Sequence, residues 1–282
     1  MVKKSLNNIS PLAPKGIKRL SPVEGVSLYT YCANLYNKHR NDLSVFLFHN
    51  KSFIAEVFTK SSLRSATLDW NFQALKGKEV QAIVVNAGNA NTFTGRQGKK
   101  AIEKVVKTIA TQFKISKKKI FVASTGVIGE PFPTQKVIKA LKGKKSPSKN
   151  WIDAARSIMT TDTYPKGISI NTSIGNQKVK ITGIAKGSGM IEPNMATMLG
   201  FIFTDAELSQ SILRSLISKF IPDSFNSISV DGDESTNDTV ILTSTNAKKL
   251  NKKIHSINDK RLKKFKLDLE KVFLYLAEQI VR

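Results

Sequence analysis

The sequence has little of several residue types on which common functions depend. It contains one cysteine, Cys32, so no internal disulfide can form, and a reducing compartment is expected. Its three histidines, His39, His49 and His255, have no Cys, His or carboxylate neighbours at metal-ligand spacing, so no metal site is expected. No uncharged apolar run approaches the roughly 18 residues of a transmembrane helix, which argues against a membrane partner.

Arginine is also scarce, with 8 arginines against 37 lysines, although the net charge is +24. Nucleic-acid-binding proteins usually need arginine for bidentate contacts to bases and phosphates, so a nucleic-acid partner is not expected. A lysine-rich, solvated surface is the preferred interpretation, and a polyanion-binding face is the alternative. Residues 1–16 hold three lysines but no apolar core of a signal peptide, so we expect a cytoplasmic protein.

Motifs for the commonest cofactors and nucleophiles are incomplete. Residues 186–190 (KGSGM) lack the last glycine of a nucleophile elbow, and the same glycines fail the dinucleotide fingerprint. Gly98 and Lys99 lack the first glycine and the hydroxyl of a phosphate-binding loop. No cofactor is therefore expected.

The chain of 282 residues is 40% hydrophobic, which is enough to fill a sizeable core. Apolar runs and amphipathic stretches alternate, which predicts an α/β, layered fold. The expected strands cover residues 43–48 and 53–58 as a hairpin-like pair, 79–86, 120–123, 179–185, 198–203, 227–230 and 239–243. The expected helices cover 99–113, 134–141 and 151–159, one capped by Asp205, and one from Asp259 to the last residue. Because the apolar stripe of this last helix is still periodic at Arg282, we expect the sequence to stop within a fold.

Loops rich in Gly, Asn and Thr follow several expected strands, over residues 86–95, 124–129 and 186–204. Such loops expose backbone N–H groups that can face a developing negative charge, but they contain no imidazole base. A threonine that becomes a chain N-terminus carries its own base, because an α-amine has a pKa of about 7.7–8.0. Thr197 in NMATML is a candidate, although a threonine in an apolar run is usually only a strand residue.

The order of these motifs resembles that of the ornithine acetyltransferases, or glutamate N-acetyltransferases, which are bifunctional enzymes of arginine biosynthesis. The matching segments cover nearly the whole chain. They are PLAPKG (11–16), RNDL (40–43), VFT (57–59), NAGNAN (86–91), STGVIG (124–129), MTTDT (159–163), KGSGMI (186–191), PNMATML (193–199), DGD (231–233) and STNDT (235–239).

The resemblance implies a fold similar to that of N-terminal-nucleophile hydrolases and implies roles for individual residues. Cleavage between Ala196 and Thr197 would divide the chain into regions 1–196 and 197–282 and would make Thr197 the nucleophile. Thr125 and Gly126 match the oxyanion-hole pair of the family. Thr163, Lys186 and Thr197 match positions that bind substrate.

The implied reaction is ping-pong transfer of acetyl from N-acetylornithine to glutamate, with acetyl-CoA as a further possible donor. The implied assembly is a heterotetramer of two α and two β chains. Two alternatives stay open from the sequence: a related self-cleaving aminopeptidase, and an inactive or truncated lysine-rich protein that binds polyanions.

Overall fold

The computed structural model describes residues 9–16, 19–36, 39–74, 79–143, 145–191, 198–233 and 235–282. The strands are β1 (Val26–Tyr31), β2 (Leu43–Phe58), β3 (Glu79–Asn89), β4 (Ile120–Val127), β5 (Lys166–Ile174), β6 (Gln177–Lys186), β7 (Leu199–Ala206) and β8 (Thr239–Lys248). The α-helices are α1 (Ala66–Ala74), α2 (Gly95–Phe113), α3 (Thr134–Lys142), α4 (Ile152–Ser157), α5 (Gln210–Phe220) and α6 (Lys263–Val281).

The strands form one hydrogen-bonded path in the order β4-β3-β2-β8-β7-β6-β5, with β1 paired to β2. The first half of β2 pairs with β1 and β3, and the residues from Phe53 onward pair with β8. Between Leu47 and Ser52 the register of the β2–β3 ladder shifts. The expected hairpin over 43–58 is therefore wrong, because the two runs belong to one strand whose halves find different partners.

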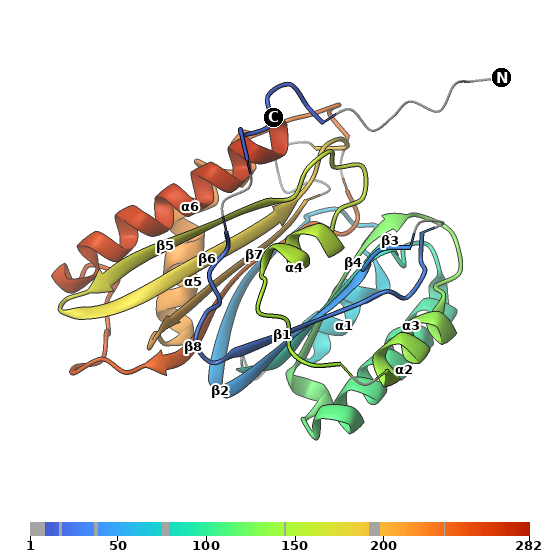
Figure 1. The fold of residues 1–282 in the computed structure, drawn as a ribbon, viewed down its shortest axis with the longest axis horizontal. Helices are drawn as coiled ribbons and strands as arrows, with labels where there is room; N and C mark the ends of the chain where they lie inside the picture. The colour runs from blue at the N-terminus through green and yellow to red at the C-terminus, as the bar shows by residue number, and fades with distance from the viewer. Residues whose placement is uncertain are drawn as a thin grey trace.

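The path folds into two facing layers of strands, and helices cover the outer side of each (Figure 1). Between the strand layers, the Phe46 ring of β2 lies 4.7 Å from that of Phe203 of β7, and Trp151 lies 5.1 Å from the same ring. Alternate residues of β3 and β4 pack outward against α2 and α3, and those of β6 and β7 pack outward against α5 and α6. Three apolar interfaces separate four layers, so the predicted layered α/β fold is confirmed.

The long helices follow the amphipathic patterns closely. The stripe of α2 is buried as expected, and Lys114 ends that helix in a left-handed conformation. The prediction that Asp205 caps a helix is wrong: Asp205 lies in β7, and Ser209 caps α5 by accepting a hydrogen bond from the amide of Ile212. The predicted strand over 227–230 is wrong: Ser227 ends a short 3₁₀ helix, and Val230 makes an isolated bridge with Ile191. The sequence analysis missed β1, β5 and α1.

The ladders bring several chain segments to the same end of the strand layers. Asn86 near the end of β3 lies beside Ser124 near the end of β4. Lys186 at the end of β6 pairs with Leu199 at the start of β7, and Leu199 pairs with Thr239 at the start of β8. The Gly/Asn/Thr segments that stood out in the sequence therefore meet at one end of the molecule. The prediction that they are loops is wrong in part, because 86–89, 124–127 and 199–204 lie in strands β3, β4 and β7.

Candidate functional site

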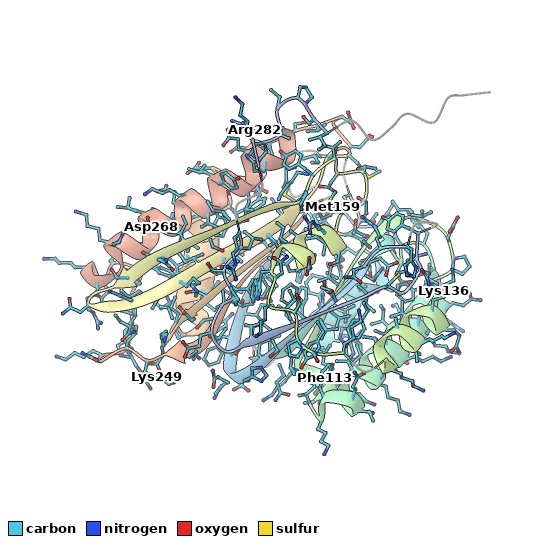
Figure 2. The ribbon with its side chains drawn as sticks, in the orientation of Figure 1. Phe113, Lys136, Met159, Lys249, Asp268 and Arg282 are labelled. Carbon is cyan, nitrogen blue, oxygen red and sulfur yellow. The ribbon has the colours of Figure 1, made fainter. Side chains whose placement is uncertain are left out.

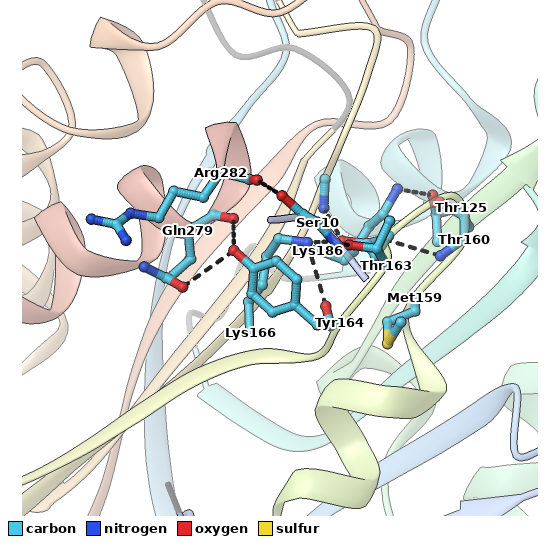
Figure 3. Close-up of polar contacts among 12 residues, drawn as sticks. Ser10, Thr125, Met159, Thr160, Thr163, Tyr164, Lys166, Lys186, Gln279 and Arg282 are labelled. Atoms are coloured by element: carbon cyan, nitrogen blue, oxygen red, sulfur yellow. Dashed lines mark hydrogen bonds and ion pairs between the residues drawn. The ribbon is translucent and has the colours of Figure 1, made fainter. Parts of the chain in front are cut away.

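A buried lysine links the ends of two strands at this end of the molecule. The ammonium group of Lys186, at the end of β6, donates a hydrogen bond of 3.0 Å to the hydroxyl oxygen of Thr125, on β4 (Figure 3). Lys186 is 2% exposed and Thr125 is 5% exposed. A lysine ammonium has no acceptor, so the Thr125 oxygen accepts here and the hydroxyl proton is left to point to another group. The structure thus brings together two residues that are 61 positions apart in the chain.

The environment of Lys186 disfavours its charge. Burial lowers the pKa of its ammonium, and the positive charge of Lys166 acts in the same direction. The carboxylates of Asp162 and Asp238 oppose this effect and raise the pKa. Because burial is the largest influence, Lys186 gives up its proton more readily than a lysine in water does.

Asp162 is the centre of a second group of contacts behind Lys186. Its carboxylate accepts hydrogen bonds from the Lys166 ammonium (2.5 Å), the Gly187 amide (2.9 Å) and the Thr160 amide (3.1 Å). The side chains of Asp162 and Lys166 are 0% and 3% exposed, so this ion pair is excluded from water. Asp162 thereby holds both the backbone that follows Lys186 and a second buried positive charge.

Gly126 follows Thr125 at a point where the backbone leaves no room for a side chain. Its φ is +131°, and a Cβ atom placed there would lie 2.3 Å from the carbonyl carbon of Gly88. Such a contact is closer than atoms can approach, so the two strand ends pack backbone against backbone. The glycine requirement at this position comes from packing between β3 and β4.

Asn237 ties the ends of β3 and β4 to the start of β8. Its side-chain amide donates to the carbonyl oxygens of Ala90 (2.7 Å) and Ser124 (2.8 Å). Its own side-chain oxygen accepts from the hydroxyls of Thr92 and Thr236, each at 2.7 Å. The carbonyl of Ser124 belongs to the peptide unit before Thr125. Asn237 therefore holds the backbone that leads into the expected oxyanion residues.

Asp238 makes the corresponding contact to the start of β7. Its carboxylate accepts a hydrogen bond of 2.8 Å from the amide of Met198, and the Met198 carbonyl accepts one of 3.1 Å from the amide of Thr239. Both Met198 and Asp238 are 0% exposed. Met198 directly follows Thr197. The predicted cleavage residues, Ala196 and Thr197, lie outside the described residues.

Thr163, the other predicted substrate residue, lies beside Asp162 on the exposed side of the same loop. Its hydroxyl oxygen accepts a hydrogen bond of 3.1 Å from the amide of Ser10. The Ser10 hydroxyl in turn donates to the carbonyl of Arg282, at 2.5 Å (Figure 3). The structure thus places an N-terminal segment and the end of α6 against the loop that carries Thr163.

The structure brings Lys186, Thr125 and Gly126 together and places Thr163 on a neighbouring loop. The sequence analysis quoted Asp162, Asn237 and Asp238 within motifs but gave them no role. The signal that could have found them is their position, because each lies next to a residue or motif expected in the site. Within the described ranges, no group of three or more His, Cys, Asp or Glu side chains could hold a metal ion. In the same part of the chain, every helix is too short or too polar to cross a bilayer.

Two facing strand layers between helices, with polar loops gathered at one end, define a class of folds that includes the N-terminal-nucleophile hydrolases. A solved aminopeptidase, the L-aminopeptidase D-Ala-esterase/amidase of Ochrobactrum anthropi, described as a variant of that fold, aligns with 94% of this chain and 87% of its own. The TM-score is 0.55 at 12% identity, so the similarity is one of fold. The expected fold relationship is confirmed.

The sequence comparison is more specific. The model of the ArgJ family matches residues 27–282, and the chain belongs to that family. The arginine biosynthesis bifunctional protein ArgJ of Zymomonas mobilis is 42% identical over 276 residues, which are 98% of this chain and 67% of that protein. The ArgJ protein of Bradyrhizobium diazoefficiens is 41% identical over 281 residues, which are 98% of this chain and 68% of that protein.

A crystal structure of the Bacillus halodurans ArgJ protein aligns with a TM-score of 0.59 at 30% identity, over 64% of this chain and 95% of that one. The family resemblance inferred from the motifs is confirmed. The family assignment also fits the expectation that the chain is an enzyme of the acyltransferase class and has a role in arginine biosynthesis.

Proposed function

We propose that this chain transfers an acetyl group from N-acetylornithine to glutamate through Thr197, after cutting itself between Ala196 and Thr197. The observation that carries the proposal is the hydrogen bond between Lys186 and Thr125 at the end of the strand layers where Met198, the neighbour of Thr197, is held. The family relationship to proteins named for arginine biosynthesis supports the choice of substrates.

The self-cleavage step needs only groups of the chain and one water molecule. The Thr197 hydroxyl attacks the carbonyl carbon of Ala196, the C–N bond breaks, and the acyl group passes from nitrogen to oxygen as an ester. Water then hydrolyses the ester, which leaves a carboxylate at Ala196 and a free α-amine at Thr197. This amine has a suitable pKa to act as a general base for the adjacent hydroxyl.

The proposed transfer has two halves. The Thr197 amine takes the hydroxyl proton while the oxygen attacks the acetyl carbonyl of N-acetylornithine, and the C–N bond breaks as the proton passes to the departing ornithine amine. The amine of glutamate then attacks the acetyl-threonine ester and leaves as N-acetylglutamate. The same scheme accepts acetyl-CoA as a donor, with its thiol as the leaving group.

Thr125 and Gly126 supply the proposed oxyanion donors. Since Lys186 donates to the Thr125 oxygen, the Thr125 hydroxyl proton is available to a developing oxyanion. A nearby ammonium adds favourable charge in a site that excludes water. Lys186 and Thr163 are the proposed contacts for the polar groups of the substrate.

The two proposed pieces, 1–196 and 197–282, would stay together after cleavage. β7 of the second piece pairs with β6 of the first, and β8 pairs with β2. Severing one peptide bond outside these ladders leaves their hydrogen bonds intact. We propose a cytoplasmic heterotetramer of two α and two β chains, as the family resemblance implies, and light scattering on the cleaved protein would measure its mass.

The test is to incubate the purified chain and to follow its intact mass and its N-terminal sequences with time. We expect a new terminus at Thr197 in the natural chain, none in Thr197→Ala, and slower cleavage in Thr197→Ser, which retains a hydroxyl. N-acetylglutamate formed from N-acetylornithine and glutamate is then measured by mass spectrometry. An uncut chain without acetyl transfer contradicts the proposal, and hydrolysis of peptide amides without acetylglutamate favours the aminopeptidase alternative.

A further inference from the structure

Two neighbouring residues, Asn237 and Asp238, touch both sides of the candidate site. The Asn237 amide holds the carbonyl before Thr125, and the Asp238 carboxylate holds the amide after Thr197. These contacts come from consecutive positions, so one short segment links the end of β4 to the start of β7.

The segment itself is firmly anchored. The amide of Thr59 donates to the Asp238 carbonyl at 3.1 Å, and the amide of Ser65 donates to the Thr236 carbonyl at 3.2 Å. Asn237 is 8% exposed and Asp238 is fully buried. Because the backbone is hydrogen-bonded at Thr236 and at Asp238, the side chains of Asn237 and Asp238 have little freedom to move.

We propose that Asn237 and Asp238 form a positioning pair, which holds Met198, the residue that directly follows the proposed nucleophile Thr197, in a fixed position relative to the end of β4 that carries Thr125 and Gly126. The inference rests on the proposed function, because it assigns roles to residues that act through Thr197. Neither side chain is proposed to contact the substrate. Their effect is to reduce the motion that the reacting groups must lose before attack.

Asp238 has a second consequence that a purely structural residue would not have. The charged groups that face Lys186 are the carboxylates of Asp162 and Asp238 and the ammonium of Lys166. Loss of the Asp238 charge removes one of the two groups that raise the pKa of Lys186. Without it, Lys186 becomes neutral at a lower pH, while the hydrogen bond to Met198 can still form if an oxygen acceptor is kept.

The experiment compares Asp238→Ala with Asp238→Asn in the full chain. Asp238→Ala removes a hydrogen bond from an amide to a charged acceptor, and we expect self-cleavage to slow by about 10- to 100-fold. Asp238→Asn keeps an acceptor for the Met198 amide, so cleavage should stay within about 3-fold of the natural rate, an estimate that follows from retaining a neutral hydrogen bond. In Asp238→Asn the alkaline limb of kcat/KM for acetyl transfer should move to lower pH.

Asp268→Asn is the matched control. Asp268 is also a buried carboxylate, but it lies on α6, where it accepts hydrogen bonds from Thr172, Lys264 and Lys271. This variant should lose some stability and keep both the natural cleavage rate and the natural pH profile. Thermal unfolding of each variant shows whether it folds. If Asp238→Ala does not fold, the comparison of Asp238→Asn with the natural chain remains as the test.

The outcomes separate this inference from the proposed function. If the natural chain never cuts itself, the proposed function fails and the positioning role falls with it. If the natural chain is cut and both Asp238 variants match it in cleavage rate and pH profile, only the positioning role is overturned. If the profile of Asp268→Asn shifts as far as that of Asp238→Asn, the effect is not local to Lys186, and the inference is also overturned.

Discussion

The two ends of the strand layers carry similar charges in very different surroundings. At one end, Asp162 and Lys166 form an ion pair with almost no exposed surface. At the other end, Glu79 pairs with Lys51 and Lys119, and Glu207 pairs with Lys249, whose side chain is 71% exposed. In Figure 2, Met159 lies near the first end and Lys249 lies at the second.

The comparison shows at which end an ion pair is energetically costly, so that its presence calls for a functional explanation. An exposed ion pair contributes about 0–1 kcal/mol, because water and salt screen it. A buried pair carries a desolvation penalty of several kcal/mol, and it persists only when its hydrogen bonds are satisfied. Asp162 meets this condition, because its carboxylate accepts hydrogen bonds from three donors. A buried carboxylate that is satisfied in this way is expected where its charge acts on Lys186.

The largest expected effect comes from breaking the buried pair. Asp162→Ala leaves the Lys166 ammonium buried without its partner and the Gly187 amide without its acceptor. We expect a loss of about 3–5 kcal/mol in the free energy of unfolding, measured by urea denaturation. Asp162→Asn is the milder comparison, because it keeps the shape and an acceptor oxygen. A loss below 1 kcal/mol in Asp162→Ala would contradict the view that this end is dry, since that is the upper range of an exposed pair.

Lys186→Met should change the free energy of unfolding less than Asp162→Ala does, but it should reduce the rate of acetyl transfer strongly. The variant keeps the Asp162–Lys166 pair and removes an ammonium whose pKa burial lowers, so the free energy of unfolding at pH 7 should change by less than about 2 kcal/mol. Acetyl transfer should fall by about 100-fold or more, which is the scale for loss of a charge that supports an oxyanion donor.

The pH dependence gives Lys186→Met a second readout. Since the pKa of Lys186 is lower in the folded protein than the 10.5 of the unfolded chain, the unfolded state binds more protons between these two values. Lys186 therefore makes stability rise with pH in that interval, and its cost is fully present below the folded pKa. Urea titrations at several alkaline pH values should show this rise in the natural chain and a smaller rise in Lys186→Met. An equal slope in the natural chain and in Lys186→Met would show that Lys186 has the same pKa in the folded and unfolded states, and would contradict the lowered pKa.

The smallest effect is expected at the opposite end, from Glu79→Gln. The hydrogen bonds from Lys119 and Lys51 lower the pKa of the Glu79 carboxyl from its ordinary value of 4.5. The stability it contributes is therefore present above pH 4.5 and is lost as the pH falls through the lower, folded value. Because Lys51 is mostly exposed, the loss at pH 7 should be about 0–1 kcal/mol by urea denaturation. A loss as large as that of Asp162→Ala would remove the contrast between the two ends.

Much of the fold could be predicted from the sequence, because long amphipathic helices and apolar strands carry periodic patterns that do not depend on distant residues. α2 and α6 follow their stripes closely, whereas β4 continues through Ser124, Thr125 and Gly126 to Val127, which the sequence analysis had placed in a loop. The sequence analysis did not predict β1, β5 and α1, which are short or contain many polar residues, so that their patterns are weak. It also read β2 as a hairpin, because an apolar run, a polar break and a second apolar run look the same in both arrangements.

The sequence by itself determined the layered α/β class, the order of the motifs and the resemblance that selects Thr125, Gly126, Lys186 and Thr197. Only the tertiary structure decided which charges share a low-dielectric environment, since the segments that bring Asp162, Lys186 and Asp238 together are far apart in the chain. Burial and Coulomb interactions depend on distances in space. No local pattern of residues encodes these distances, so the surroundings of Lys186 emerge only when the strand ends meet.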